Sequence, residues 1–188
     1  MSIEVHPVTP ERWPGMVELF ERRGPRGGSK LTPAYGCWCM YWRDRTLPHG
    51  EPKKKAMQAL VQKGREPGLL AYGAGVPVGW VSVAPRAEFP HILRSPQYRP
   101  RDEGGGSAVW SIVCFALDRD YRNRGIAASL LEGAVAHAFA HGATSVEAYP
   151  HVSQPHDYMG TVELYRRAGF QHVRAANKRA IVRLELVT

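Results

Sequence analysis

Alternating apolar and polar positions predict strands in three parts of the chain. Residues 3–8 alternate between apolar and polar, and residues 181–187 do so again, which is the period of a half-buried strand. Between them, residues 69–72 and 78–83 are apolar runs separated by a Gly- and Pro-containing turn at 73–77. Two such runs around a short turn predict a β-hairpin. These segments therefore predict a sheet that draws on distant parts of the sequence.

A period of 3.6 residues predicts four helices. The clearest covers residues 126–141, where apolar side chains recur on one face and Gly142 follows as a helix-ending residue. Thr9 and Thr161 stand where N-cap residues are expected for two shorter helices. The three shorter helices are expected over residues 10–23, 52–63 and 161–168.

The remaining segments predict two more strands and one irregular connection. Residues 109–117 form a nearly continuous apolar run, typical of a central strand buried on both faces. Residues 146–149 predict a further strand, ended by Pro150. Residues 84–107 show no clean period, and a structureless connection of that length is often a lid or a binding loop. A connection without a functional role is equally consistent with the pattern.

Composition predicts a single cytoplasmic domain over residues 1–188. Apolar residues make up 44% of the chain and charged residues 22%, an ordinary globular balance. No stretch approaches the roughly 20 apolar residues of a membrane-spanning helix, and the first residues lack the features of a secretory signal. Three cysteines are too few and too odd in number for a disulfide framework, which favours a reducing compartment.

The net charge of +8 is compatible with a polyanionic partner or a phosphate-rich cofactor, but does not identify one. The basic residues are dispersed, and the one basic triplet, at 53–55, falls at the start of a predicted helix and is expected on a solvated face. No recognition helix or aromatic–basic repeat indicates nucleic-acid binding. Nucleic acid is therefore an unfavoured partner.

The segment from Asp118 to Ala128 has the features of an anion site. A buried strand leads into a short loop of Arg and Gly, and the loop opens directly into the strongest helix. Free amides at a helix N-terminus carry partial positive charge and bind phosphate groups. Gly125 permits close approach of a ligand to the backbone, while Arg122 and Arg124 add positive charge. This arrangement suits a diphosphate.

The spacing in this loop distinguishes among phosphate-binding motifs. Neither the G-x-G-x-x-G nor the G-x-x-x-x-G-K-S/T pattern is present. The spacing R-x-x-G-x-A, from Arg122 through Gly125 to Ala127, resembles the coenzyme A loop of the GCN5-related N-acetyltransferases, the GNAT superfamily. Further along, residues 163–170 (ELYRRAGF) are similar to the Tyr-x-x-x-Gly-Phe ending of that family's fourth helix. The order of predicted elements over residues 2–187 matches as well.

The resemblance implies an α/β fold: a mixed, mostly antiparallel sheet of about seven strands flanked by about four helices. It also implies that the fourth and fifth strands, at 109–117 and 145–149, run parallel and splay apart. The pantetheine arm of acetyl-CoA would lie between them, against the backbone of Phe115, Ala116 and Leu117. The diphosphate-binding residues implied by the resemblance are Arg122, Asn123, Arg124, Gly125, Ile126, Ala127 and Ala128.

Transfer of an acyl group from a thioester to an amine needs a proton donor for the thiolate and a proton acceptor for the amine. Tyr165 stands where the resembled family often places the acid, and a phenol is protonated at neutral pH. Packing of its ring in the core is the alternative. The strand at 109–117 holds no carboxylate, so Glu147, His151 or a water could act as base. A solvated strand position is equally expected for Glu147, and a surface position is favoured for His151.

Other reactive or aromatic residues are open to two interpretations each. Cys37 and Cys39 lack the second Cys or His pair of a zinc site, so no metal is expected and buried inert thiols are favoured. Trp38, Tyr41 and Trp42 could line an acceptor pocket, although core packing is the simpler expectation. The charged residues of the irregular connection, which could contact the acceptor, are Arg86, Glu88 and Glu103.

The residues and the resemblance together predict an acetyl-CoA-dependent N-acyltransferase acting on a primary amine of a small molecule or peptide. The alternative is a catalytically weak acyl-CoA-binding sensor, which the absence of a carboxylate on the central strand favours. The resemblance also leaves a homodimer open.

Overall fold

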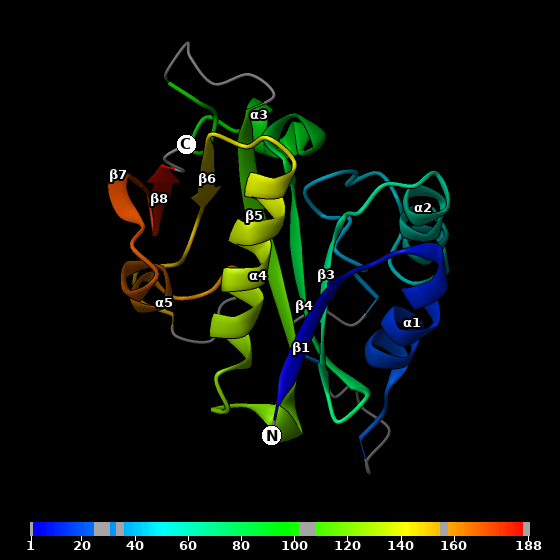
Figure 1. Ribbon diagram of the computed structural model, residues 1–188. Coiled ribbons are helices and arrows are strands. Elements are labelled where there is room, and N and C mark those ends of the chain that lie inside the picture. Colours follow the sequence, from blue (N-terminus) through cyan, green and yellow to red (C-terminus); the bar gives the residue numbers. More distant parts are fainter. Residues whose placement is uncertain (1, 25–30, 33–35, 102–107, 155–157, 186–188) are drawn as a thin grey trace.

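The computed structural model describes residues 2–24, 31–32, 36–101, 108–154 and 158–185. One twisted sheet runs through the molecule (Figure 1), in the order β1-β3-β4-β5-β6-β8-β7. Every pairing along this path is antiparallel except that of β5 with β6. A two-residue strand, β2, pairs with the end of β5. The bounds are β1 Ile3–Pro7, β2 Leu31–Thr32, β3 Gly68–Gly73, β4 Val76–Pro85, β5 Val109–Asp118, β6 Ser145–Ala148, β7 Gln171–Ala176 and β8 Arg179–Glu185.

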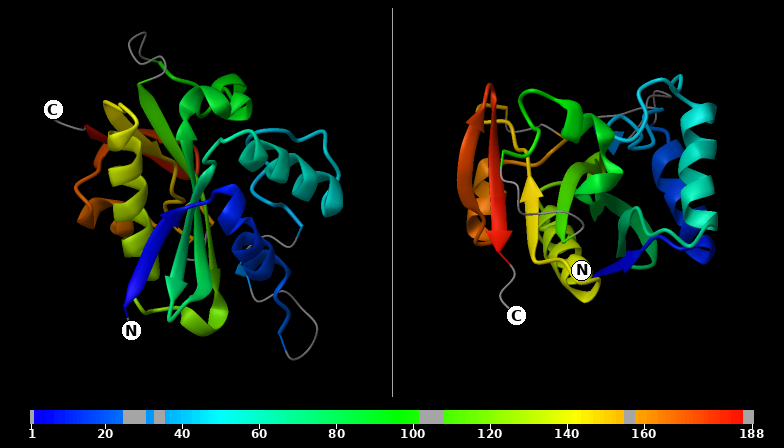
Figure 2. Two further views of the ribbon diagram at one scale, coloured as in Figure 1. Left: turned by 45° about the vertical axis from the view of Figure 1, so that its right-hand side comes forward. Right: turned by 90° about the horizontal axis from the view of Figure 1, so that it is seen from above.

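Helices cover both faces of this sheet. The pair α1 and α2 lies on one face, and α4 with α5 lies on the other (Figures 1 and 2). The bounds are α1 Trp13–Glu21, α2 Glu51–Gln62, α3 Pro90–Arg94, α4 Ile126–Ala140 and α5 Val162–Arg167, with single 3-10 turns at η1 Pro10–Arg12, η2 Arg86–Glu88 and η3 Arg119–Tyr121. The predicted α/β fold with parallel fourth and fifth strands is confirmed, these two strands being β5 and β6. Within the described ranges, no helix is long and apolar enough to cross a membrane.

The central strand contributes to two separate cores, which explains its unbroken apolar run. Val113 of β5 packs in the core under α1 and α2, whereas Ile112 packs in the core under α4 and α5. Trp80 and Val81 of β4 divide in the same way. Because successive side chains of a strand face opposite sides, a strand covered on both faces has no polar alternation.

Two glycines allow α4 to lie unusually close to the sheet. A Cβ atom on Gly79 would stand 2.9 Å from Leu117 Cδ2 and 3.0 Å from Ile126 Cγ2. A Cβ atom on Gly133 would stand 2.7 Å from Val5 Cγ1. The close contact at Gly79 brings the first turn of α4 against the end of β5, where the predicted cofactor loop lies.

The expectation of a structureless connection over residues 84–107 is wrong for its first half. Strand β4 continues to Pro85, and η2 and α3 follow directly. Phe89 and Ile92, both fully buried, anchor this segment. A helix of five residues is too short to show a period in the sequence, so tertiary burial is what defines it. Residues 102–107, and Glu103 with them, lie outside the described residues.

Smaller differences concern caps and the basic triplet. The helix predicted at 10–23 is divided into η1 and α1, and Thr9 makes no side-chain capping bond. Thr161 does cap α5, since its hydroxyl accepts a hydrogen bond from Leu164 N at 3.1 Å. Lys53 is buried, which corrects the solvated position expected for it. Trp38 and Trp42 are core residues, as the simpler expectation had it.

Candidate active site

A cavity of about 430 Å³ opens where the end of β5 meets the start of α4. Its wall includes all of the predicted cofactor residues except Ala116 and Arg124. Four further wall residues come from the segment between β6 and the first turns of α5. The complete lining is Phe115, Leu117, Tyr121, Arg122, Asn123, Gly125, Ile126, Ala127, Ala128, Tyr158, Gly160, Thr161 and Leu164. We call this cavity the loop pocket.

The loop before α4 lines the loop pocket with residues whose backbone conformation is unusual. Asn123 and Gly125 both have left-handed backbone angles, with φ of 58° and 79°. A Cβ atom built on Gly125 would meet nothing within 4 Å, so the space above this residue is open. The amides of Ile126 and Ala127, in the first helical turn, have no acceptor within the helix. This geometry leaves polarised N–H groups available to an anion.

A buried carboxylate fixes the start of this loop from behind. Asp118, which is 1% exposed, accepts hydrogen bonds from the amide of Asp120 at 3.0 Å and from Arg22 at 2.8 Å. On the other side of the loop, the Arg124 guanidinium lies over the Tyr121 ring at 5.4 Å from its centroid. The loop is therefore held in position by residues on both sides of it.

The edge of β5 that faces the loop pocket is only partly available for pairing. The β5–β6 pairing ends at Ile112, one residue before the irregularity at Val113 in the β4–β5 ladder. Beyond it, the amide of Phe115 donates to the carbonyl of Tyr158 at 2.5 Å. Leu117 pairs with Gly79 of β4 on one edge of β5 and with β2 on the other. Strand β2 therefore occupies the same edge of β5 that faces the loop pocket.

Tyr165 lies directly behind the wall of the loop pocket. Its side chain is fully buried, its hydroxyl donates to the carbonyl of Met159 at 2.9 Å, and its ring packs against Phe170 at 5.1 Å between centroids. The neighbouring Gly160 does line the pocket, and a Cβ atom there would be 3.3 Å from the Tyr165 hydroxyl. The Tyr165 ring is thus a core residue, and only Gly160 separates its hydroxyl from the loop pocket.

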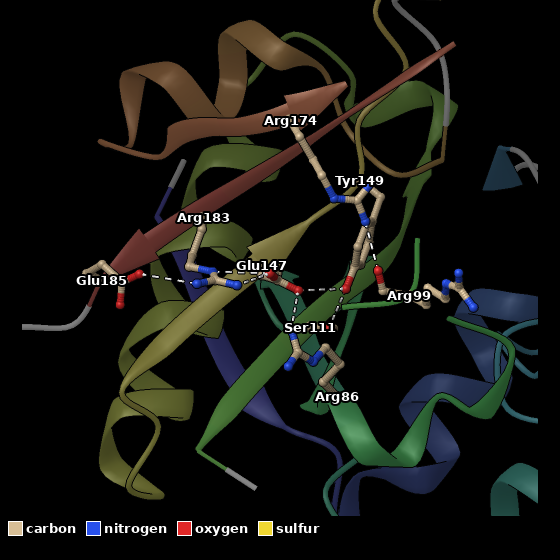
Figure 3. A network of polar contacts seen from close by, with 8 residues as sticks. All are labelled: Arg86, Arg99, Ser111, Glu147, Tyr149, Arg174, Arg183 and Glu185. Carbon is tan, nitrogen blue, oxygen red and sulfur yellow. Dashed lines mark hydrogen bonds and ion pairs between the residues drawn. The ribbon is translucent and has the colours of Figure 1, made fainter. Parts of the chain in front are cut away.

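Glu147 is at the centre of a buried network on β6 rather than at a solvated position (Figure 3). One carboxylate oxygen accepts from Arg86 at 2.9 Å and from the Tyr149 hydroxyl at 3.2 Å. The other accepts from two nitrogens of Arg183, at 3.1 and 2.6 Å. Ser111 completes the network through the Tyr149 hydroxyl at 2.9 Å. Burial, together with the nearby Glu147 charge, raises the pKa of Tyr149, so this phenol stays protonated.

The Glu147 network borders a different cavity from the loop pocket. This second cavity measures about 300 Å³, and Tyr98, Arg101 and Arg174 stand around it with Glu147 and Arg183. Arg174 donates to the carbonyl of Gln97 at 2.8 Å. It also donates to the carbonyl of Arg99 at 2.9 Å (Figure 3). The structure therefore does not bring Glu147 into contact with the predicted cofactor residues.

The other residues singled out from the sequence have structural partners. His151 is 9% exposed, which corrects its expected surface position, and its Nδ1 accepts from the amides of Ser153 and Gln154 at 3.1 Å each. Cys39 accepts a hydrogen bond from the Trp80 indole at 3.1 Å. Burial raises the pKa of the Cys37 thiol, and the electrostatic interaction with Cys39 acts in the same direction, so the protonated thiol is favoured.

A third cavity, of about 900 Å³, lies between α4 and α5 and shares Ala128, Thr161 and Leu164 with the loop pocket.

The sequence pattern missed Tyr158 and Gly160 as residues of the loop pocket. The one sequence signal for this turn is that Gly160 directly precedes the predicted N-cap residue Thr161. In the structure Gly160 has a φ of 80°, which favours glycine.

Comparison with known proteins places this fold and pocket in a class. The model of the acetyltransferase (GNAT) family matches residues 34–170, so the chain belongs to this family. No curated protein sequence matches. Among solved structures, the GNAT domain of S. lividans PAT is similar, with a TM-score of 0.60, 16% identity, and coverage of 98% of this chain and 90% of that one.

Two further structures share the fold. PaiA N-acetyltransferase from Thermoplasma acidophilum, solved in complex with coenzyme A, has a TM-score of 0.56, 14% identity, and coverage of 99% of this chain and 100% of that chain. An N-acetyltransferase from Staphylococcus aureus Mu50 has a TM-score of 0.57, 14% identity, and coverage of 98% and 99%. At these identities the likeness shows the fold alone.

Proposed function

We propose that the protein is an acetyl-CoA-dependent N-acyltransferase that moves an acetyl group to a primary amine of a small molecule or peptide by direct attack on the thioester. The observation that carries this proposal is the loop pocket, in which Phe115, Leu117 and the N-terminus of α4 share one wall. The coenzyme A complex of a structure with the same fold supports the choice of cofactor.

The residues of the loop pocket suit the two parts of coenzyme A differently. The amides from Asn123 to Ala128 would hold the diphosphate, with Arg122 and Arg124 adding charge. Phe115, Ala116 and Leu117 would contact the pantetheine arm. Backbone pairing at Phe115 would require the Tyr158 carbonyl to give up its present bond, so we expect this segment to adjust when the cofactor binds.

For proton transfer, Tyr165 is the proposed acid. In this role the hydroxyl would donate its proton to the departing thiolate instead of to the Met159 carbonyl. Gly160 leaves room for this approach, because it has no side chain beside the hydroxyl. Glu147 remains a candidate base, but both of its oxygens are already hydrogen-bonded to Arg86, Tyr149 and Arg183. We therefore favour a water as the group that removes the amine proton.

The same observations support the second candidate, a catalytically weak acyl-CoA sensor. The amide of Phe115 already has an acceptor, and none of the described residues that line the loop pocket is a carboxylate. A sensor and an enzyme would both bind acetyl-CoA, but only the enzyme would release free CoA faster when an amine is added. A thiol-release assay across amino acids, polyamines, aminoglycosides and peptide N-termini separates the two.

Calorimetric titration of acetyl-CoA tests the cofactor assignment. Wild type should bind with micromolar affinity, and the double variant Arg124→Glu, Gly125→Asp should not bind, because it reverses charge and adds a strained side chain at the open position. Arg94→Glu is the control, since it reverses an exposed charge on α3 and should leave binding unchanged. Absence of binding by the wild type would refute the proposal.

Two further assignments accompany the proposed function. We place the reaction in the cytoplasm, and the free thiols of Cys37, Cys39 and Cys114 support a reducing compartment. We expect one domain over residues 1–188 and consider a homodimer, which light scattering of the purified protein would test.

A further inference from the structure

Three side chains that can bind a metal ion meet at the end of α4 opposite the loop pocket. His137 lies in the last turn of α4, His141 follows the helix one turn later, and Glu66 belongs to the connection between α2 and β3. One Glu66 oxygen is 3.6 Å from His137 Nε2 and 3.6 Å from His141 Nε2. One ligand atom from each residue lies within 4.8 Å of the others.

These separations are more suitable for coordination than for hydrogen bonding. A hydrogen bond from nitrogen to oxygen measures about 2.7–3.2 Å, so 3.6 Å is too long. Bonds of about 2.1 Å from one ion to nitrogen and oxygen ligands, arranged tetrahedrally, separate the ligand atoms by roughly 3.4 Å. The two separations of 3.6 Å between nitrogen and oxygen are therefore close to what an ion bound between these atoms would require.

The ring of His141 is held in the orientation that a metal ligand needs. Its Nδ1 lies 2.8 Å from the carbonyl of His137. A carbonyl can only accept, so Nδ1 carries the proton, and in the neutral ring Nε2 keeps its lone pair. Metal-binding histidines commonly donate their other N–H to a backbone carbonyl in this way.

His137 supplies an independent observation. Its side chain is 7% exposed, yet its Nε2 is a buried polar atom with no hydrogen-bond partner within the described part of the chain. The Trp110 ring packs against both imidazoles, at 5.6 and 5.7 Å between centroids, and restricts their rotation.

We propose that Glu66, His137 and His141 form a binding site for a divalent transition-metal ion, with Zn²⁺ as the occupant. Two imidazoles and one carboxylate favour Zn²⁺ over Mg²⁺ or Ca²⁺, which prefer oxygen ligands. His141 is 49% exposed, so the fourth position opens to solvent and would take a water.

At this position the ion would have a structural role rather than a catalytic one. The helical rise of about 1.5 Å per residue puts His137 roughly 16 Å from the first turn of α4, where the loop pocket begins. The ion would join the α2–β3 connection to the end of α4. Because the three ligands come together only in the folded chain, the ion would stabilise the folded state.

Titration of Zn²⁺ into tag-free, chelator-treated protein tests the site directly. We expect one ion per chain with micromolar or tighter affinity, and visible absorption bands of tetrahedral Co²⁺ when cobalt replaces zinc. Glu66→Gln and His141→Ala should each weaken Zn²⁺ binding by about 10- to 100-fold or more. His6→Ala is the matched control, because His6 also lies 3.5 Å from a glutamate oxygen, but no group of three ligands that includes it is found in the described part of the chain.

Thermal unfolding provides a readout that does not depend on spectroscopy. Zn²⁺ at about 100 times its dissociation constant should raise Tm by about 5 °C or more in wild type and in His6→Ala, and much less in the two site variants. A Cys37→Ser, Cys39→Ser variant should bind Zn²⁺ as wild type does. No binding, binding unchanged in Glu66→Gln and His141→Ala, or binding that requires the two cysteines would each overturn the proposal.

Discussion

Two polar regions along β5 differ in whether their polar groups are hydrogen-bonded within the protein. At the end of the strand, the loop pocket presents helix amides and Gly125 to open space. Near its start, beside Ser111, the Glu147 carboxylate is enclosed, and each of its oxygens accepts two hydrogen bonds. Polar groups left without internal partners are available to a ligand, whereas groups that satisfy one another stabilise the fold. The comparison predicts that changes in one region affect stability and changes in the other affect binding.

The largest effect is expected from Glu147→Gln. Removing this charge takes away the carboxylate that pairs with both Arg86 and Arg183 in a buried site. Loss of one partner of a buried ion pair costs about 3–5 kcal/mol of unfolding free energy. Urea denaturation should show this loss, while calorimetry should show unchanged acetyl-CoA affinity.

Glu163→Gln is the matched control for this change. Glu163 also pairs with two arginines, Arg166 and Arg167, but all three side chains are about half exposed or more. Exposed pairs contribute little, so the urea midpoint should move far less than for Glu147→Gln. Equal effects of the two substitutions would contradict the comparison.

Gly79→Val should have the next largest effect. The new side chain would meet Leu117, Ile126 and Leu130 at about van der Waals contact or closer, and overpacking of this kind costs about 1–3 kcal/mol. Because Leu117 and Ile126 also line the loop pocket, acetyl-CoA binding should weaken as well. A stable variant with unchanged affinity would show that α4 does not need this close contact.

Thr161→Ala should cost about 1 kcal/mol, the usual contribution of a helix N-cap. Its hydroxyl accepts a hydrogen bond from the amide of Leu164, so the substitution should destabilise the first turn of α5. Thr9→Ala is the control: Thr9 occupies the corresponding position before η1, but makes no capping bond. Thermal unfolding of both variants checks the difference, and equal losses would contradict the cap assignment.

The smallest effect concerns acid stability. Hydrogen bonds from Arg166 and then Arg167 lower the pKa of Glu163 to about 2 from its ordinary value near 4.5. A carboxylate with a lowered pKa stabilises the folded state above its ordinary value, and this contribution is lost as the pH falls from 4.5 to 2. The small Tm difference between wild type and Glu163→Gln should therefore shrink over that window. A difference that stays constant would rule out this pair as its cause.

The cofactor loop could be predicted from the sequence because its residues are contiguous. The spacing of Arg122, Gly125 and Ala127, between a strand and a helix, is enough to indicate an anion site. The family match over residues 34–170 includes this loop, and its role in binding coenzyme A stays a prediction. The helix α3 could not be predicted in the same way, since Phe89 and Ile92 define it only through burial.

The sequence alone therefore determined the order of the main strands and helices and the fold class, and it predicted a cofactor loop, because these depend on periodicity and local spacing. Tertiary structure decided which polar groups are paired and which face a cavity. Arg86, Glu147 and Arg183 come from three separate elements, and Glu66 meets His137 and His141 only after α4 packs on the sheet. Contacts between residues far apart in the chain depend on the packed arrangement of the whole fold, which no local pattern records.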